Sequence, residues 1–122
     1  MCPDNPIGTV DVYLVNHHGL DISNAPPLVY GLKPRVAIMP NGAKKGGMPD
    51  AIAWIRKSPG LEDLWQLHYS LPGKEANVAE QFIANPEEKC QGFGIKLVAA
   101  ANGSFTVTNE RNNFTKQYKA RR

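Results

Sequence analysis

Two adjacent histidines and a glycine, His17, His18 and Gly19, are the residues of this chain most able to do chemistry. Imidazole is the commonest metal ligand in proteins and the usual general base near neutral pH. The pair follows a β-branched and aromatic run at residues 10–15, which predicts a buried strand. Neighbouring side chains on a strand point to opposite faces, so both rings reach one site only if the strand ends there, and Gly19 permits that ending. An ordinary hydrogen-bonded pair without a ligand explains the spacing equally well.

The elements that position this pair are predicted to alternate between strands and helices. Residues 35–40 and 61–70 predict two further strands, and residues 21–34 and 49–60 each contain a predicted short helix. A β-α-β-α-β order with short connections implies a parallel sheet with right-handed crossovers. Ligand sites gather at the carboxyl ends of such strands, which is where the histidines lie.

Three polar residues, Asp21, Ser23 and Asn24, follow the histidines on the same loop. They could orient a histidine or contact a substrate. Turn formation and helix capping explain them more simply. We expect Ser23 or Asn24 to be the N-cap of the first helix, with the prolines that follow in its first turn and Pro34 at its end.

The chain changes character after residue 72. Residues 73–90 are polar and predict a loop with one helical turn. Residues 93–109 predict two strands around Asn102-Gly103, the strongest hairpin signal in the chain. A second turn is expected at Asn112-Asn113, before a last strand. The tail is therefore expected to be an antiparallel meander within the same domain.

Composition excludes some classes of protein. The 122 residues are 42% hydrophobic and 20% charged, as in an ordinary globular domain, and the net charge of +3 is too small to favour nucleic acid as a partner. The start lacks the features of a signal peptide, and no apolar run reaches the ~20 residues that span a bilayer. Cys2 and Cys90 form no metal-binding motif, and nothing requires them to pair. The cysteines therefore do not indicate whether the protein works in an oxidising or a reducing compartment.

A glycine-rich loop at residues 41–49 carries Lys44 and Lys45 after the second strand. Backbone amides in such a loop can cradle a phosphate, and the lysines would add charge. The loop does not match the G-x-x-x-x-G-K-[ST] pattern of nucleotide-binding loops. A solvated loop is the simpler explanation, as it is for the basic residues at positions 116–122.

Residues 9–39, TVDVYLVNHHGLDISNAPPLVYGLKPRVAIM, resemble the distal half of metallo-β-lactamase-fold hydrolases. The resemblance is to the branch found in competence (DNA-uptake) proteins and their stand-alone relatives. In that branch a D-V-x-x-V strand runs into H-H-G, a Ser/Asn-rich turn and a short helix follow, and L-K-P-R-V-A-I forms the next strand. The fold implied is the carboxyl-terminal half of an αββα sandwich.

The resemblance also implies a zinc-dependent activity. In that family a histidine at the end of this strand, here His17 or His18, helps to hold the second metal of a two-metal site. Its neighbour then supports it or contacts the substrate. Two metals clamp an anionic substrate, such as a phosphodiester, and lower the pKa of a bridging water that attacks it.

The chain departs from the family in what it lacks. The H-x-H-x-D-H loop, a further histidine and a bridging aspartate are absent, and His68 lies within a predicted strand. A catalytic zinc needs about three protein ligands. Residues 1–122 are therefore expected to form one truncated domain that is inactive alone. Its apolar face would be covered by the missing amino-terminal half or by a second copy.

Two functions follow from the sequence. The first is the carboxyl-terminal part of a zinc hydrolase that acts on anionic substrates. The alternative is a non-enzymatic α/β module that binds an anion or a protein partner through Lys44, Lys45 and the basic tail. Metal-free catalysis with His17 as a base ranks third, because no nucleophile is paired with it.

Overall fold

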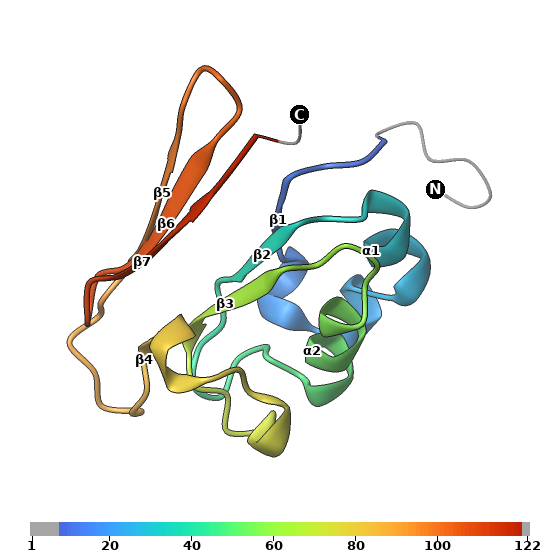
Figure 1. Cartoon of the computed structure of the whole chain (residues 1–122). Coiled ribbons are helices and arrows are strands. Elements are labelled where there is room, and N and C mark those ends of the chain that lie inside the picture. Colours follow the sequence, from blue (N-terminus) through green and yellow to red (C-terminus); the bar gives the residue numbers. More distant parts are fainter. Residues whose placement is uncertain (1–7, 121–122) are drawn as a thin grey trace.

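A parallel sheet of four strands forms the centre of the fold in a computed structural model that describes residues 8–120. The strands are β1 (Val12–Leu14), β2 (Val36–Met39), β3 (Asp63–His68) and β4 (Ile83–Asn85), and they pair in chain order. The predicted strands at residues 10–15, 35–40 and 61–70 are confirmed, each slightly shorter than expected. Figure 1 shows these strands in blue, cyan, green and yellow, with β1 at one edge.

Helices α1 (Pro26–Leu32) and α2 (Pro49–Arg56) cover one face of this sheet (Figure 1). Both begin with proline, whose fixed φ suits the first turn and whose missing N–H costs nothing there. The side chains packed between helices and sheet are those of Tyr13, Val15, Val29, Leu32, Ala37, Met39, Ile52, Ile55 and Leu64. None of the helices in the described part of the chain is long and apolar enough to cross a bilayer.

The expected N-cap of α1 is wrong. Ala25 occupies that position and makes no capping hydrogen bond with its side chain. Asn24 is instead fully buried, where its amide joins neighbouring loop atoms. The other end agrees with the prediction, because Lys33 adopts a left-handed conformation (φ 47°) and Pro34 follows it.

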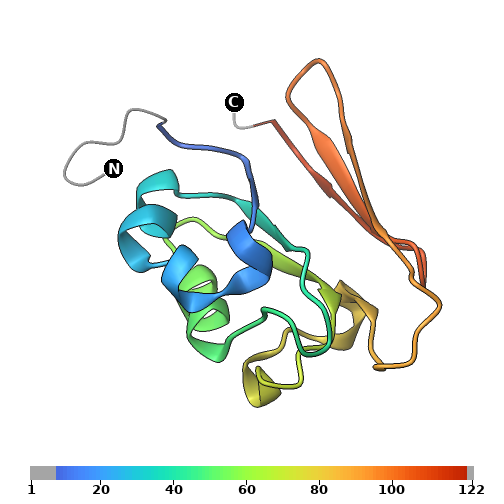
Figure 2. The same ribbon diagram turned by 180° about the vertical axis from the view of Figure 1, so that it is seen from behind.

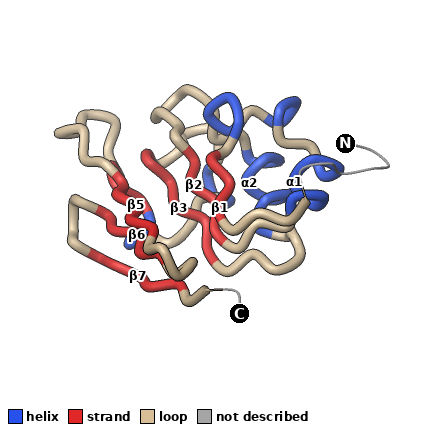
Figure 3. Tube along the Cα trace, turned by 90° about the horizontal axis from the view of Figure 1, so that it is seen from above, coloured by secondary structure: helices blue, strands red, loops and turns tan. Residues whose placement is uncertain are grey.

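The tail forms the predicted antiparallel meander of β5 (Ile95–Ala99), β6 (Phe105–Asn109) and β7 (Phe114–Tyr118). The first turn lies at Asn102-Gly103, where Gly103 has a φ of 94°, and the second includes Asn113 with a φ of 59°. Both positive φ angles suit these residue types. Figures 2 and 3 show the meander as a third layer, on the opposite side of the parallel sheet from the helices.

The two sheets pack through a core of large apolar side chains. Its buried members are Val36, Trp65, Phe105, Val107 and Tyr118. The Trp65 ring lies 4.9 Å from the Phe82 ring and 5.6 Å from the Phe114 ring, measured between centroids. We expected a half-sandwich with one bare apolar face, but the meander covers much of that face. The exposed large apolar side chains are Leu14, Ile22, Leu71, Leu97 and Val98.

The segment at residues 73–90 contains more regular secondary structure than predicted. It contains two 3-10 turns, Lys74–Ala76 and Glu80–Phe82, and then the fourth parallel strand, β4. Gln66 pairs with Ile83, and His68 pairs with Asn85. Three residues are too few to show a period-2 pattern. Pairing with β3, rather than sequence pattern, makes this segment a strand, and all three of its residues are buried.

The structure is therefore mixed α/β, with a parallel four-stranded sheet and an antiparallel three-stranded sheet. The β-α-β-α-β unit followed by a meander agrees with the sequence.

Candidate functional site

The histidine pair lies at the carboxyl edge of the parallel sheet, in a 3-10 turn at Asn16–Gly19 directly after β1. His17 has a φ of 49° and His18 a φ of 57°, so both are in the left-handed region. This conformation costs a non-glycine residue about 1–2 kcal/mol. Strained residues persist only where their surroundings fix them, and they cluster at functional sites.

The loop at residues 41–48 fixes the backbone of the pair. The Gly47 N–H donates to the His18 carbonyl at 2.8 Å, and the Met48 N–H donates to the Gly19 carbonyl at 3.0 Å. A Cβ at Gly46 would lie only 1.8 Å from the His18 carbonyl oxygen. The glycines of this loop therefore allow it to pack directly against the histidine backbone.

The His18 ring is held in one orientation. Its Nδ1 lies 2.8 Å from the Pro40 carbonyl oxygen, in a half-buried position. A carbonyl oxygen can only accept, so Nδ1 carries a proton in this contact, and in the neutral ring the lone pair is then on Nε2. This is the arrangement of most metal-binding histidines, in which a carbonyl or carboxylate orients the ring through its other nitrogen.

The His17 ring is more exposed and less constrained. Its Nδ1 lies 3.3 Å from the Ser23 hydroxyl, which can either donate or accept. The two histidine rings are 6.3 Å apart between centroids and tilted by 55°. Asp21 is engaged locally, because its Oδ1 accepts from the Ile22 N–H at 2.9 Å. The hydrogen-bond partner therefore identifies Nε2 as the nitrogen available to a ligand in His18, whereas the Ser23 hydroxyl leaves the roles of the two nitrogens of His17 open.

Asn24 supports the turn from beneath. Its amide donates to the carbonyls of Asn16 at 2.9 Å and Leu20 at 2.7 Å, and its oxygen accepts from the Tyr13 hydroxyl. Burial raises the pKa of Tyr13, which keeps this hydroxyl protonated as a donor. Because Asn24 is fully buried, it positions the turn and is out of reach of a substrate.

Two further polar side chains join the carboxyl ends of β2 and β3. Buried Asn41 donates to the His68 carbonyl at 2.9 Å and accepts from the His68 N–H at 3.2 Å. Buried Ser70 donates to the Gly47 carbonyl at 2.6 Å. The loop that clamps His18 is thus tied to β3.

Lys44 and Lys45 project from this loop into solvent. Lys44 is 73% exposed and forms an ion pair with Glu88 at 3.0 Å. The Lys45 carbonyl accepts from the Gly42 N–H at 2.8 Å. This amide and that of Gly47 are therefore used within the protein, which leaves fewer donors for an anion than the glycine-rich sequence suggested.

A complete metal site is not formed by residues 8–120, which contain no group of three or more His, Cys, Asp or Glu side chains placed to hold an ion. His68, the third histidine, ends β3 and lies beside Cys90 rather than beside His18. The edge thus presents one oriented imidazole nitrogen that is free for a ligand.

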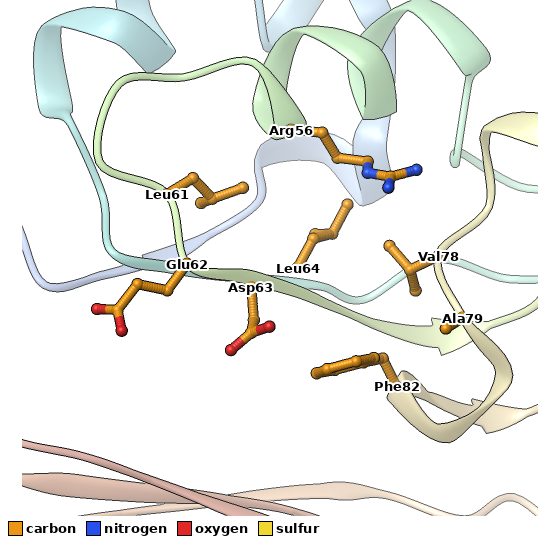
Figure 4. Close-up of a pocket in the computed structure, with 8 residues that line it drawn as sticks. All are labelled: Arg56, Leu61, Glu62, Asp63, Leu64, Val78, Ala79 and Phe82. Atoms are coloured by element: carbon orange, nitrogen blue, oxygen red, sulfur yellow. The ribbon is translucent and has the colours of Figure 1, made fainter.

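A separate pocket of about 270 Å³ lies at the amino end of β3. Figure 4 shows the side chains of Arg56, Glu62, Asp63 and Phe82 around it. Asp63 is already engaged, because its Oδ2 accepts from Lys116 at 2.6 Å and from the Tyr118 hydroxyl at 2.6 Å. Asp63 therefore joins the two sheets, and Glu62 is paired with Arg35 at 2.8 Å, so both carboxylates of the pocket are engaged within the protein.

Comparisons with protein-family models, with curated proteins and with solved structures found no match to this chain. The geometry of the site therefore has to carry the functional argument.

Sequence reasoning missed the residues that hold His18 in place, namely Pro40, Asn41, Gly46, Gly47 and Ser70. The Gly46-Gly47 pair was a visible signal, but it suggested a phosphate loop. In the structure Gly46 packs closely against the His18 backbone, and Gly47 packs against the side chains of Ser70 and Asn41.

Proposed function

We propose that this chain is the carboxyl-terminal part of a metal-dependent hydrolase, in which His18 supplies one zinc ligand. The observation that carries the proposal is the hydrogen bond from His18 Nδ1 to the Pro40 carbonyl, which leaves Nε2 free at the carboxyl edge of a parallel sheet. The resemblance of residues 9–39 to metallo-β-lactamase-fold hydrolases supports the same class.

The residues present fit one ligand of a zinc site and not a whole site. Since a catalytic zinc takes about three protein ligands, the others must come from polypeptide outside residues 8–120 or from a second chain. When bound, zinc would polarise an anionic substrate and activate water. The role of this chain is to hold the His18 ring and aim Nε2, with His17 close by.

The open side of β1 is where such a partner would dock. β1 is an edge strand, and its Leu14 is 64% exposed. Ile22, in the loop that follows the histidines, is 82% exposed. Edge strands with exposed apolar side chains pair readily with further strands. A partner strand placed against β1 would bring its own carboxyl or amino end beside His18.

The alternative, a non-enzymatic module that binds an anion or a protein partner through Lys44, Lys45 and the basic tail, is less well supported. Lys44 is paired with Glu88, and the amides of Gly42 and Gly47 are used within the protein. In the tail, Lys116 is paired with Asp63 at 2.6 Å, and residues 121–122 lie outside the described part of the chain.

Two titrations separate these functions. Zn²⁺ alone and inorganic phosphate alone are titrated calorimetrically into a Cys2→Ser/Cys90→Ser double variant, which removes binding at both thiols. We expect weak Zn²⁺ binding that is lost in His18→Gln and retained in the matched variant Lys45→Gln. Phosphate binding that disappears in Lys45→Gln, with no Zn²⁺ binding at all, would establish the alternative and overturn the hydrolase proposal.

A further inference from the structure

Cys90 and His68 form a second pair of reactive side chains, distinct from the histidine turn. The His68 Nε2 lies 3.3 Å from the Cys90 Sγ, within the range for a hydrogen bond to sulfur. Cys90 is a free, exposed cysteine in the loop after β4. The pair therefore combines an accessible thiol with a group that can take its proton.

His68 is positioned rigidly for this contact. Its backbone N–H and carbonyl are both bonded to the Asn41 side chain, at 3.2 and 2.9 Å. Its Nδ1 is buried and has no hydrogen-bond partner among the described residues. Buried polar atoms are rarely left unpaired, and an unpaired one needs an explanation. The only ring nitrogen of His68 with a partner is the one that faces the sulfur.

The loop that carries Cys90 is anchored at both ends. Asn85 bonds to the backbone of Phe93 twice, accepting from its N–H at 2.9 Å and donating to its carbonyl at 2.8 Å. Glu88, within the loop, is paired with Lys44 at 3.0 Å. These contacts hold the thiol near His68.

An open pocket of about 240 Å³ adjoins the thiol. Its charged lining consists of Lys89, Arg111 and Glu87, and Phe93 contributes an apolar surface. Arg111 is already engaged, because it is paired with Glu80 at 3.9 Å and donates to the carbonyls of Glu80 and Ile83. Lys89, next to the thiol in the chain, is therefore the cation of this lining that a small anionic ligand would meet. The pocket therefore suits an anionic reagent that approaches Cys90.

We propose that Cys90 and His68 form a thiol–disulfide exchange site for small anionic disulfides of the glutathione type. His68 Nε2 takes the thiol proton, and the Cys90 sulfur attacks one sulfur of the disulfide. The new S–S bond forms as the old one breaks, and the departing thiolate takes the proton from His68 and leaves as a thiol. The disulfide is the oxidant, and Cys90 ends as a mixed disulfide. This modification is independent of the metal site proposed for His18.

The test follows mixed-disulfide formation by mass spectrometry in a Cys2→Ser background, where Cys90 is the single thiol. We expect glutathione disulfide to react about tenfold more slowly with His68→Gln than with the parent, because a free thiol is only a few per cent thiolate at pH 7. Lys89→Gln should slow glutathione disulfide but leave the neutral 2-hydroxyethyl disulfide unchanged.

Denaturant supplies the control for folding. Unfolded parent and unfolded His68→Gln should share one rate, and the native parent should react faster than its unfolded form. Equal rates for the native and unfolded parent would overturn the proposal, even if His68→Gln fails to fold. Equal rates for native parent and native His68→Gln would also overturn it.

Discussion

Two regions of the parallel sheet are built on opposite principles. One face of the sheet packs on the meander through a core of large apolar side chains that includes Trp65, Phe105 and Tyr118. At its carboxyl end, His17 and His18 are held in left-handed conformations by amides, carbonyls and buried polar side chains. Burial of apolar side chains stabilises the fold in the first region, whereas the strained backbone of the second region lowers stability and fixes the positions of the two histidines.

The comparison teaches where a substitution should act. A residue of the inter-sheet core should change the stability of the fold and leave the orientation of His18 alone. A substitution at the carboxyl edge should change the orientation of the His18 ring, even where the substituted side chain buries little surface.

The largest expected effect comes from Trp65→Ala. Trp65 is fully buried, contacts the rings of Phe82 and Phe114, and donates to the Tyr118 hydroxyl at 3.1 Å. Its loss should lower the free energy of unfolding by about 3–5 kcal/mol, measured by urea denaturation. Trp54→Ala, on the partly exposed face of α2, is the matched control and should cost clearly less. Equal losses would show that the two sheets are not held by this core.

A sharper test of the carboxyl edge compares Gly46→Ala with Gly92→Ala. The two glycines have φ angles of 74° and 75°, so the backbone cost of about 1–2 kcal/mol is shared. A Cβ at Gly46 meets the His18 carbonyl, whereas one at Gly92 meets nothing within 4 Å. Gly46→Ala should therefore cost about 1–3 kcal/mol more in urea denaturation.

The same two variants distinguish backbone strain at the glycine from displacement of the His18 ring. The NMR signal of the His18 ring should move in Gly46→Ala and stay in place in Gly92→Ala. If both variants unfold at the same urea concentration with unchanged His18 signals, the loop does not clamp the histidine.

The smallest effect concerns pH. Burial, and then the hydrogen bond to Asp63, raises the pKa of Tyr118 in the folded protein. The unfolded hydroxyl ionises near pH 10. Above that pH the unfolded state binds fewer protons than the folded state, so the stability supplied by Tyr118 is complete below about pH 10 and falls as pH rises. The slope reaches about 1.4 kcal/mol per pH unit for each such group.

Tyr118→Phe removes this contribution. Urea unfolding between about pH 9 and about pH 11 should show a shallower loss of stability in the variant than in the parent. Parallel pH profiles would mean that Tyr118 ionises alike in both states.

Much of the fold was predictable because its signals are local. The apolar runs that became β1, β2 and β3, the prolines that begin α1 and α2, and the Asn102-Gly103 turn each act within a few residues. β4 was not predictable, since three residues carry no periodicity and only pairing with β3 defines them.

The candidate site was predictable in part for the same reason. Its position at the end of β1 followed from the strand pattern and Gly19. The tautomer of His18 did not, because it depends on the Pro40 carbonyl, 22 residues away in the chain. His68 and Cys90 are likewise 22 residues apart in the chain, and no local sequence pattern predicts their contact.

The most direct test of the central claim is the protonation state of His18, observed by NMR through couplings between ring protons and ring nitrogens. We predict that the neutral form of the ring carries its proton on Nδ1, and that the Nε2 signal shifts on addition of Zn²⁺. The assignment is made by comparison with His18→Gln. A neutral ring with its proton on Nε2, or an Nε2 signal that does not change with Zn²⁺, would contradict the proposal that His18 is a metal ligand.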